Sequence, residues 1–123
     1  PIHPRTKDKI KKLKLSFDRS IKIIEPLEYL EFLKLMKDSK LILSDSGGLQ
    51  EEASILGVPC ITLRTTTERQ ITVIRNVNII AGYNHDKILR AVKKFHNKKI
   101  KKIKDFGNGD VANKIYKIIT SYK

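Results

Sequence analysis

Three short apolar runs, separated by segments with helical periodicity, restrict this chain to one broad class of fold. The runs are Leu41–Leu43, Cys60–Leu63 and Asn78–Ala81. A continuous apolar run of this length is typical of a strand that is covered on both faces. Strands that alternate with helices over short connections form βαβ units with right-handed crossovers. We therefore predict an α/β fold, a doubly wound parallel sheet of about four or five strands.

The remaining elements follow from apolar spacing, capping residues and helix breakers. A brief β-branched run at Ile21–Ile24 predicts one further strand, and the segment around Arg64–Arg69 is irregular. The predicted helices are Pro4–Leu15, Leu27–Lys37, Gly48–Leu56, His85–Phe95 and Val111–Tyr122. A length of 123 residues allows one compact domain, which we assign to residues 1–123.

The net charge of +13 suggests nucleic-acid binding, but the charge is unevenly placed. Residues 1–40 carry +5, residues 41–82 carry −1 and residues 83–123 carry +9. Lysines outnumber arginines 20 to 6, whereas nucleic-acid readers favour arginine forks and exposed aromatic rings. We interpret the lysines as solvated helix faces and expect neither a specific nucleic-acid partner nor a membrane partner.

Cellular location is inferred from cysteine usage. The only cysteine, Cys60, cannot form an intramolecular disulfide, which favours a reducing, cytoplasmic environment. We find no signal peptide ahead of the first motif, and no apolar stretch long enough to span a membrane. The chain begins with Pro1 instead of methionine, so it is interpreted as a fragment.

The most informative motif is Ser44-Asp-Ser-Gly-Gly48, between a buried strand and a helix. Two glycines let a ligand approach the backbone, and the first helix amides favour phosphate oxygens by about 0.5–2 kcal/mol. Ser46 could donate a further hydrogen bond. The structural alternative is that Asp45 or Ser46 is merely a helix cap before a tight turn.

Acidic and basic residues near this turn favour a nucleotide. Of Glu51 and Glu52, the helix dipole explains one, and the other could bind a vicinal diol such as ribose. Arg64 and Arg69 follow the next strand and suit anion binding, although a solvated loop with an exposed ion pair would look similar. Both segments should open onto one edge of the sheet. Together these features predict a nucleoside diphosphate site.

At this point the sequence resembles the non-hydrolysing UDP-N-acetylglucosamine 2-epimerases over nearly its whole length. The resemblance rests on several motifs in family order: Glu25-Pro-Leu27, Phe32, Ser44-Asp-Ser-Gly-Gly-Leu-Gln-Glu-Glu-Ala53, Leu56-Gly-Val-Pro59, Arg64–Arg69 and Phe106-Gly-Asn-Gly109. It implies two Rossmann-like domains in the glycosyltransferase-B arrangement, with the UDP-sugar between them. This chain looks like the carboxyl-terminal domain alone.

The resemblance also implies roles for individual residues. Ser46, Gly47 and Gly48 would hold the diphosphate and Glu52 the ribose hydroxyls. Arg69 would lie near the phosphates, with an electrostatic role. The uracil would be bordered by two further residues, Leu27 and Phe32. The family pattern usually continues with Pro-Glu where this chain has Gln70-Ile71.

The implied reaction inverts C2 of the sugar by eliminating UDP to a 2-acetamidoglucal and adding it back. The acidic residues and histidine that move the proton belong, by the same resemblance, to the amino-terminal domain. We therefore expect no catalytic base here, no cofactor, no metal and no epimerisation by this chain alone. A homodimer of the complete protein is compatible with the resemblance.

The other titratable residues have simpler interpretations. His3, His85 and His96 are read as surface or structural residues, and Cys60 as a small core residue. Three alternative functions stay open. They are the donor domain of a glycosyltransferase-B sugar transferase, a basic nucleic-acid-binding module, and a non-catalytic UDP-binding or assembly role.

Overall fold

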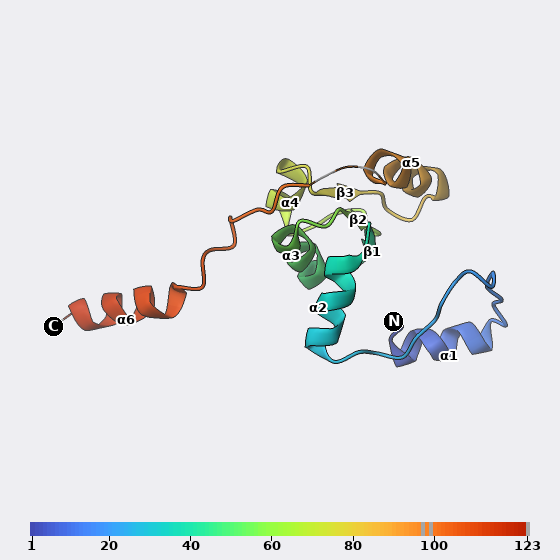
Figure 1. Cartoon of the computed structure of the whole chain (residues 1–123), viewed down its shortest axis with the longest axis horizontal. Coiled ribbons are helices and arrows are strands. Elements are labelled where there is room, and N and C mark those ends of the chain that lie inside the picture. Colours follow the sequence, from blue (N-terminus) through green and yellow to red (C-terminus); the bar gives the residue numbers. More distant parts are fainter. Residues whose placement is uncertain (97, 99, 123) are drawn as a thin grey trace. The chain divides into compact units, whose positions relative to one another are not determined.

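The computed structural model describes residues 1–96, 98 and 100–122. The chain forms two compact units, Pro1–Lys34 and Leu35–Lys123, which are described separately below (Figure 1). Helix α2 (Tyr29–Asp38) contains the boundary between them. It starts two residues later than the periodicity of its leucines predicts.

The first unit is built around helix α1 (Pro4–Lys12), which ends earlier than predicted. The side chain of His3 caps this helix by accepting a hydrogen bond from the amide of Arg5, so His3 has a structural role. The predicted strand at Ile21–Ile24 is wrong. Its backbone receives one hydrogen bond, from Ile2 N to Ile24 O, and no described strand pairs with it. A β-branched run without a neighbouring strand stays irregular.

The second unit contains a parallel sheet of three strands in the order β1 (Ile42–Ser44), β2 (Cys60–Thr62) and β3 (Asn78–Ile80). Within the described residues the sheet is therefore smaller than the four or five strands expected, because Ile21–Ile24 does not join it. Ser44 is paired with Thr62 at the carboxyl ends of β1 and β2. This register brings the segments that follow the two strands together.

Helices cover both faces of this sheet, which confirms the doubly wound arrangement. Helices α3 (Gly47–Leu56) and α4 (Gln70–Ile74) connect the strands and pack on the face that carries Thr62 and Asn78. Helix α5 (His85–Phe95) returns over the other face. The sequence predicted α5 with its observed bounds and did not predict α4.

Alternation along β2 divides the interior into an apolar side and a polar side. Ile61 points toward α5 and packs with Ala81, Ala91 and Phe95 in the apolar core. Cys60 is buried as predicted, and burial raises the pKa of its thiol to about 12. The polar side of the sheet is described with the functional site.

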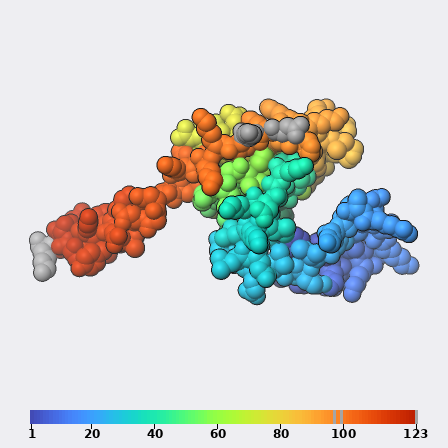
Figure 2. Space-filling view, viewed as in Figure 1, coloured from blue at the N-terminus to red at the C-terminus, as the bar shows by residue number. Residues whose placement is uncertain are grey.

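The lysine-rich segment of residues 100–104, which follows α5, lies over the carboxyl end of α3. Its Ile103 donates an amide hydrogen bond to the Ser54 carbonyl, at 3.2 Å. Gly57 ends α3 with φ +78°, and a side chain there would come within 3.0 Å of Lys102. In Figure 2 this segment, coloured orange, lies against the green and yellow elements.

The last helix, α6 (Val111–Ser121), has no buried residue. Its large apolar side chains recur at helical spacing and are all more than half exposed: Val111, Ile115, Tyr116, Ile118 and Ile119. Among the described residues, no helix combines the length and the apolar character needed to cross a membrane.

Candidate functional site

The turn between β1 and α3 is held by its own serine side chains. Ser44 Oγ accepts a hydrogen bond from Ser46 N at 3.1 Å, and Ser46 Oγ accepts one from Leu49 N at 3.4 Å. Ser46 is thus the N-cap of α3, which confirms the capping interpretation. Its hydroxyl hydrogen is not used by this bond, since the oxygen is the acceptor. Capping and ligand binding by Ser46 are therefore compatible.

The two glycines at the start of α3 are not required by the backbone conformation. Neither Gly47 nor Gly48 has a positive φ. A Cβ at Gly48 would meet its nearest neighbour, Ser46 Oγ, at 3.9 Å, so a methyl group would fit there. What a methyl group would obstruct is the approach of a ligand to the first amides of the helix.

The loop that follows β2 lies directly beside this turn. It leaves the sheet at Leu63, whose amide donates to the Ser44 carbonyl at 2.9 Å. The carboxylate of Glu68 lies over Gly47, where a Cβ would come within 2.5 Å of Glu68 Oε1. The expectation that both segments open onto one sheet edge is therefore confirmed.

Glu68 is held as an anion at this edge. A hydrogen bond from its own backbone is the main cause that lowers the pKa of its carboxyl. Burial opposes this effect, and the charges of Arg64 and Arg69 lower the pKa further. Arg64 also contacts it directly, at 3.2 Å between Nη1 and Oε2. A carboxylate therefore lies beside the electropositive end of α3.

Arg69 forms an ion pair with Glu51, through Nε and Oε1. The Nε atom is buried, yet its hydrogen is not directed so as to form a hydrogen bond with any described group. Glu51 and Glu52 lie in the second turn of α3, beyond the first turn in which the dipole stabilises acids. The helix dipole therefore does not account for an acidic residue at either position. Glu51 is accounted for by its ion pair with Arg69.

A buried polar cluster lies beneath the turn and the loop. Gln50 Oε1 accepts hydrogen bonds from Thr67 Oγ1 at 2.5 Å and Asn78 Nδ2 at 3.2 Å. The Asn78 amide also donates to Thr72 Oγ1 at 3.1 Å, and its oxygen accepts from Thr62 Oγ1 at 2.8 Å. All five side chains are at most 5% exposed.

Sequence reasoning did not identify this cluster. The three threonines before Glu68 look alike in sequence, but only Thr67 is buried. Asn78 looks like the start of an apolar strand, and Gln50 like a polar position in the turn motif. The available signal was a set of polar residues at positions where the predicted pattern requires apolar ones.

The proposed uracil residues lie elsewhere in the chain. Leu27 precedes α2, and Phe32 lies in its first turn, where its amide donates to the Glu28 carbonyl at 2.9 Å. Both side chains are partly buried. Their contact with uracil stays a prediction.

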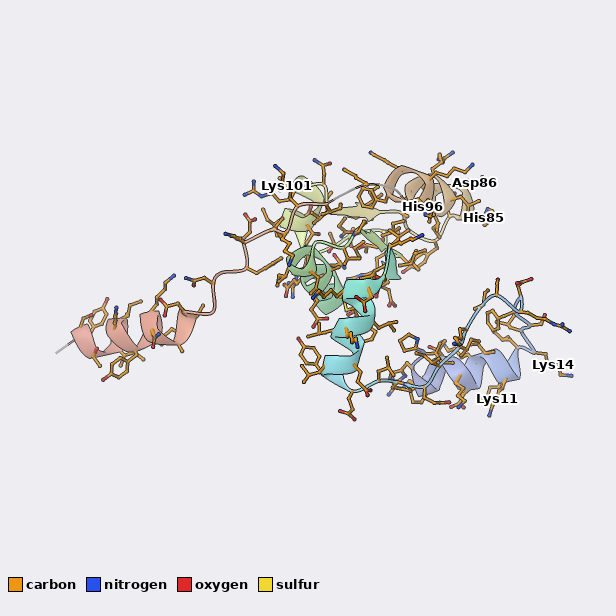
Figure 3. The ribbon with its side chains drawn as sticks, in the orientation of Figure 1. Lys11, Lys14, His85, Asp86, His96 and Lys101 are labelled. Carbon is orange, nitrogen blue, oxygen red and sulfur yellow. The ribbon has the colours of Figure 1, made fainter. Side chains whose placement is uncertain are left out.

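The histidines lie at helix ends. His85 begins α5 beside Asp86, 3.2 Å away, and His96 ends the same helix (Figure 3). Within the described ranges, no three His, Cys, Asp or Glu side chains gather closely enough to hold a metal ion.

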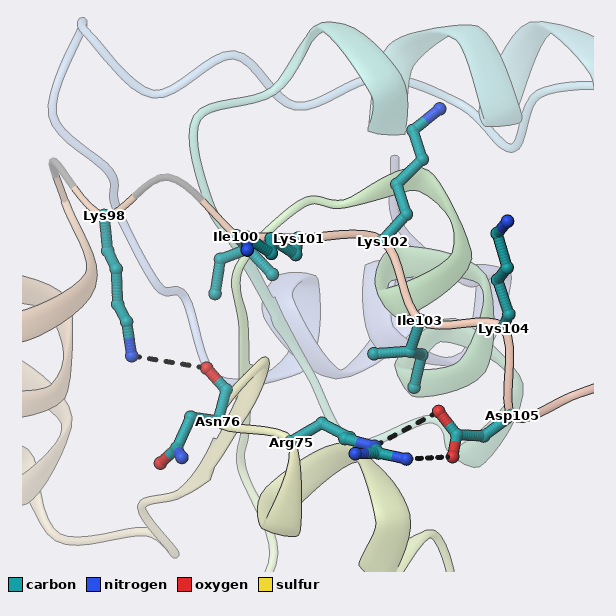
Figure 4. Close-up of a pocket in the computed structure, with 9 residues that line it drawn as sticks. All are labelled: Arg75, Asn76, Lys98, Ile100, Lys101, Lys102, Ile103, Lys104 and Asp105. Carbon is teal, nitrogen blue, oxygen red and sulfur yellow. Dashed lines mark hydrogen bonds and ion pairs between the residues drawn. The ribbon is translucent and has the colours of Figure 1, made fainter.

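A cavity of about 520 Å³ lies on the lysine-rich side of the second unit. Arg75 donates two hydrogen bonds to Asp105 across it, at 2.7 and 3.3 Å, and Lys98 donates to the Asn76 carbonyl at 3.4 Å (Figure 4). Lys102 and Lys104 extend away from this ion pair (Figure 4). The cavity therefore does not gather its positive charges around one point.

Comparison with known proteins connects this geometry to one family. The family model described as UDP-N-acetylglucosamine 2-epimerase matches residues 1–120. A UDP-N-acetylglucosamine 2-epimerase of Methanocaldococcus jannaschii is 52% identical over 97% of this chain. One of Methanococcus maripaludis is 47% identical over 100% of this chain. The chain spans about a third of these relatives, 34% and 35% respectively.

A solved structure agrees with the sequence relatives. The Methanocaldococcus jannaschii enzyme in complex with UDP-GlcNAc and UDP superposes with a TM-score of 0.86 at 51% identity, over 97% of this chain and 34% of the enzyme. The likeness supports the expected fold class, a Rossmann-like layer of the glycosyltransferase-B type. Since the family model covers nearly every residue, the chain belongs to the UDP-N-acetylglucosamine 2-epimerase family.

Proposed function

We propose that this chain supplies the UDP-binding half of the active site of a UDP-N-acetylglucosamine 2-epimerase. The observation that carries the proposal is the shared sheet edge, where the first amides of α3 and the side chain of Arg69 lie on adjoining segments. The relatives bear the name of this enzyme, and the solved relative is a complex with UDP-GlcNAc and UDP. The complete protein would interconvert UDP-N-acetylglucosamine and UDP-N-acetylmannosamine in the cytoplasm.

In this proposal the diphosphate replaces the Glu68 carboxylate at the start of α3. Gly47 and Gly48 would donate backbone hydrogen bonds, and the free hydroxyl hydrogen of Ser46 would add another. Arg69 would place positive charge near the phosphates. This charge matters when the bond between sugar and diphosphate breaks, because the leaving UDP gains a negative charge.

Two further parts of the nucleotide would be bound by the remaining predicted residues. Glu52 would accept hydrogen bonds from the ribose hydroxyls, as acids do in other nucleotide-binding βα units. Leu27 and Phe32 would border the uracil, Leu27 through its backbone and Phe32 by packing.

Proton transfer at C2 would depend on an amino-terminal domain. The relatives are about three times as long as this chain, which supports a second domain in the complete protein. Helix α6 also exposes an apolar face, and such a face is more typical of a surface that packs against another part of a protein than of one that faces water. We therefore expect this chain to bind UDP weakly and not to epimerise UDP-N-acetylglucosamine alone.

Titration of the ¹⁵N-labelled chain with UDP tests the proposed site. The amide signals of residues 45–50 should shift, because these amides surround the phosphate position. Uridine should shift them much less, since it lacks phosphates. Unchanged signals at all six positions would contradict the proposed function.

Assay of the complete protein separates epimerisation from sugar transfer. An epimerase forms UDP-N-acetylmannosamine without any acceptor, whereas a glycosyltransferase-B transferase requires an acceptor and releases UDP. Sustained epimerisation by the purified 123-residue chain would refute the expected need for a second domain.

Replacement of Glu52 tests the ribose contact. Glu52→Ala should weaken UDP binding about tenfold, the effect of losing one charge-assisted pair of hydrogen bonds. Its effect on pyrophosphate should be less than twofold, because pyrophosphate has no ribose. Asp86→Ala removes the same charge from α5 and serves as the control. Equal losses for UDP and pyrophosphate would assign Glu52 a role other than ribose binding.

A further inference from the structure

We infer that Asn78, on strand β3, is a positioning residue for the diphosphate site. It contributes no atom to the predicted ligand contacts, and the inference rests on the proposed function. Through buried side chains it connects the turn at Ser46 with the backbone that presents Arg69. Its proposed effect is to fix these two anion-binding segments relative to each other before the ligand arrives.

Both amide hydrogens and the oxygen of the Asn78 side chain are hydrogen-bonded to other buried side chains. Its two amide hydrogens go to Gln50 Oε1 and Thr72 Oγ1, and its oxygen accepts from Thr62 Oγ1. The acceptors fix which side of the amide is nitrogen and which is oxygen. A network with all members paired has one arrangement and strongly resists displacement.

One arm of the network leads from Asn78 to Arg69. Thr72 receives its hydrogen bond from Asn78 and donates its own hydroxyl hydrogen to the Arg69 carbonyl, at 2.7 Å. The Arg69 amide in turn donates to Thr67 Oγ1 at 3.0 Å. Both backbone polar groups of Arg69 are therefore tied to hydroxyls that belong to the network. The network thus anchors the backbone from which the Arg69 side chain extends.

The other arm leads from Asn78 to the turn. Gln50 accepts from Asn78 and Thr67 at the same oxygen, while its nitrogen donates to the Ser46 carbonyl at 3.4 Å. Gln50 thereby joins the loop that carries Arg69 to the residue that caps α3. The bonds among Gln50, Thr67, Thr72 and Asn78 are buried, so solvent does not compete for them, whereas the bonds to the Ser46 and Arg69 backbones are part-buried.

A solely structural role could be served equally well by apolar residues. Buried polar side chains contribute little net stability, and an apolar core of the same shape is often as stable. The face of the sheet toward α5 follows that rule, with Ile61 and Phe95 in contact. The buried polar side chains on the other face specify one geometry. The two segments that they fix are the turn at Ser46 and the loop at Arg69, which are proposed to bind the diphosphate.

The test compares UDP and uridine binding to two variants of the full chain. Asn78→Ala removes all three bonds, and Thr72→Val removes the hydroxyl that joins Asn78 to the Arg69 carbonyl. Each should lower UDP affinity about tenfold and uridine affinity less than twofold. Thr72→Ser restores the hydroxyl and should bring UDP affinity back to within twofold of the parent.

Ser54→Ala is the matched control. Ser54 is 1% exposed and donates to the Glu51 carbonyl at 2.6 Å, so its loss removes a buried hydrogen bond of α3 outside the network. It should leave UDP affinity unchanged. Where Asn78→Ala fails to fold, Thr72→Val alone decides.

Three outcomes would overturn the inference. Unchanged UDP affinity in folded Thr72→Val contradicts it while leaving the proposed function intact. Equal losses of UDP and uridine affinity indicate general structural damage and also contradict it. Failure of the parent chain to bind UDP overturns the proposed function, and the inference with it.

Discussion

A Gly48→Ala chain is expected to be slightly more stable than the parent and to bind UDP at least tenfold more weakly. The two effects have opposite signs because they have different causes. Alanine is the better helix former by up to about 1 kcal/mol, and the new methyl group meets only Ser46 Oγ, at 3.9 Å. The same methyl group stands where a phosphate would approach the first amides of α3. Thermal unfolding and UDP titration measure the two effects.

Gly47→Ala provides the comparison. A methyl group there must displace the Glu68 carboxylate, which would lie 2.5 Å from it, but the end of a flexible side chain moves at little cost. We expect this variant to lose UDP affinity as well, without the gain in stability. An unchanged UDP affinity in Gly48→Ala would show that the ligand does not approach this turn.

Replacing either partner of the Arg69–Glu51 ion pair should change UDP affinity in opposite directions. Arg69→Gln is expected to weaken UDP binding ten- to hundredfold, about 1.4–2.8 kcal/mol, because it removes a charge-assisted contact and leaves Glu51 as a nearby negative charge. Glu51→Gln should strengthen binding two- to fivefold, since it removes that charge and frees the guanidinium. Calorimetric titration with UDP measures both changes.

The double variant and the salt dependence complete this test. Arg69→Gln combined with Glu51→Gln should bind more tightly than Arg69→Gln alone, because the unpaired carboxylate is gone. The gain from Glu51→Gln should shrink as salt rises, since both side chains are about one-third exposed. Weaker binding by Glu51→Gln would mean that the ion pair holds Arg69 in its active position.

The elements that sequence predicted well are those with strong, local patterns. Helix α5 has a capping asparagine, Asn84, and a regular apolar stripe, so both ends were found. The strand prediction for Ile21–Ile24 failed because strand formation depends on a partner, and a run of side chains carries no information about one. Helix α4 has five residues, too few to show a helical period.

The turn within the candidate site was predicted because its signals, too, are local in the sequence. A strand, two glycines and a helix start are consecutive in the chain, so the turn at Ser46–Gly48 could be located. The cluster around Asn78 joins positions 16 and 28 residues apart, at Thr62 and Gln50. Only the register of the parallel strands brings these together, and the register is a property of the folded sheet.

The rate at which the Cys60 thiol is alkylated can measure how often the sheet becomes accessible. Alkylating reagents react with the thiolate, and with a pKa of about 12 the thiolate is about one molecule in 10,000 at pH 8. The residue is also only 1% exposed and lies on β2, the central strand of the sheet. Labelling must therefore await an opening of the fold that exposes β2, and its rate in native buffer reports how often this happens.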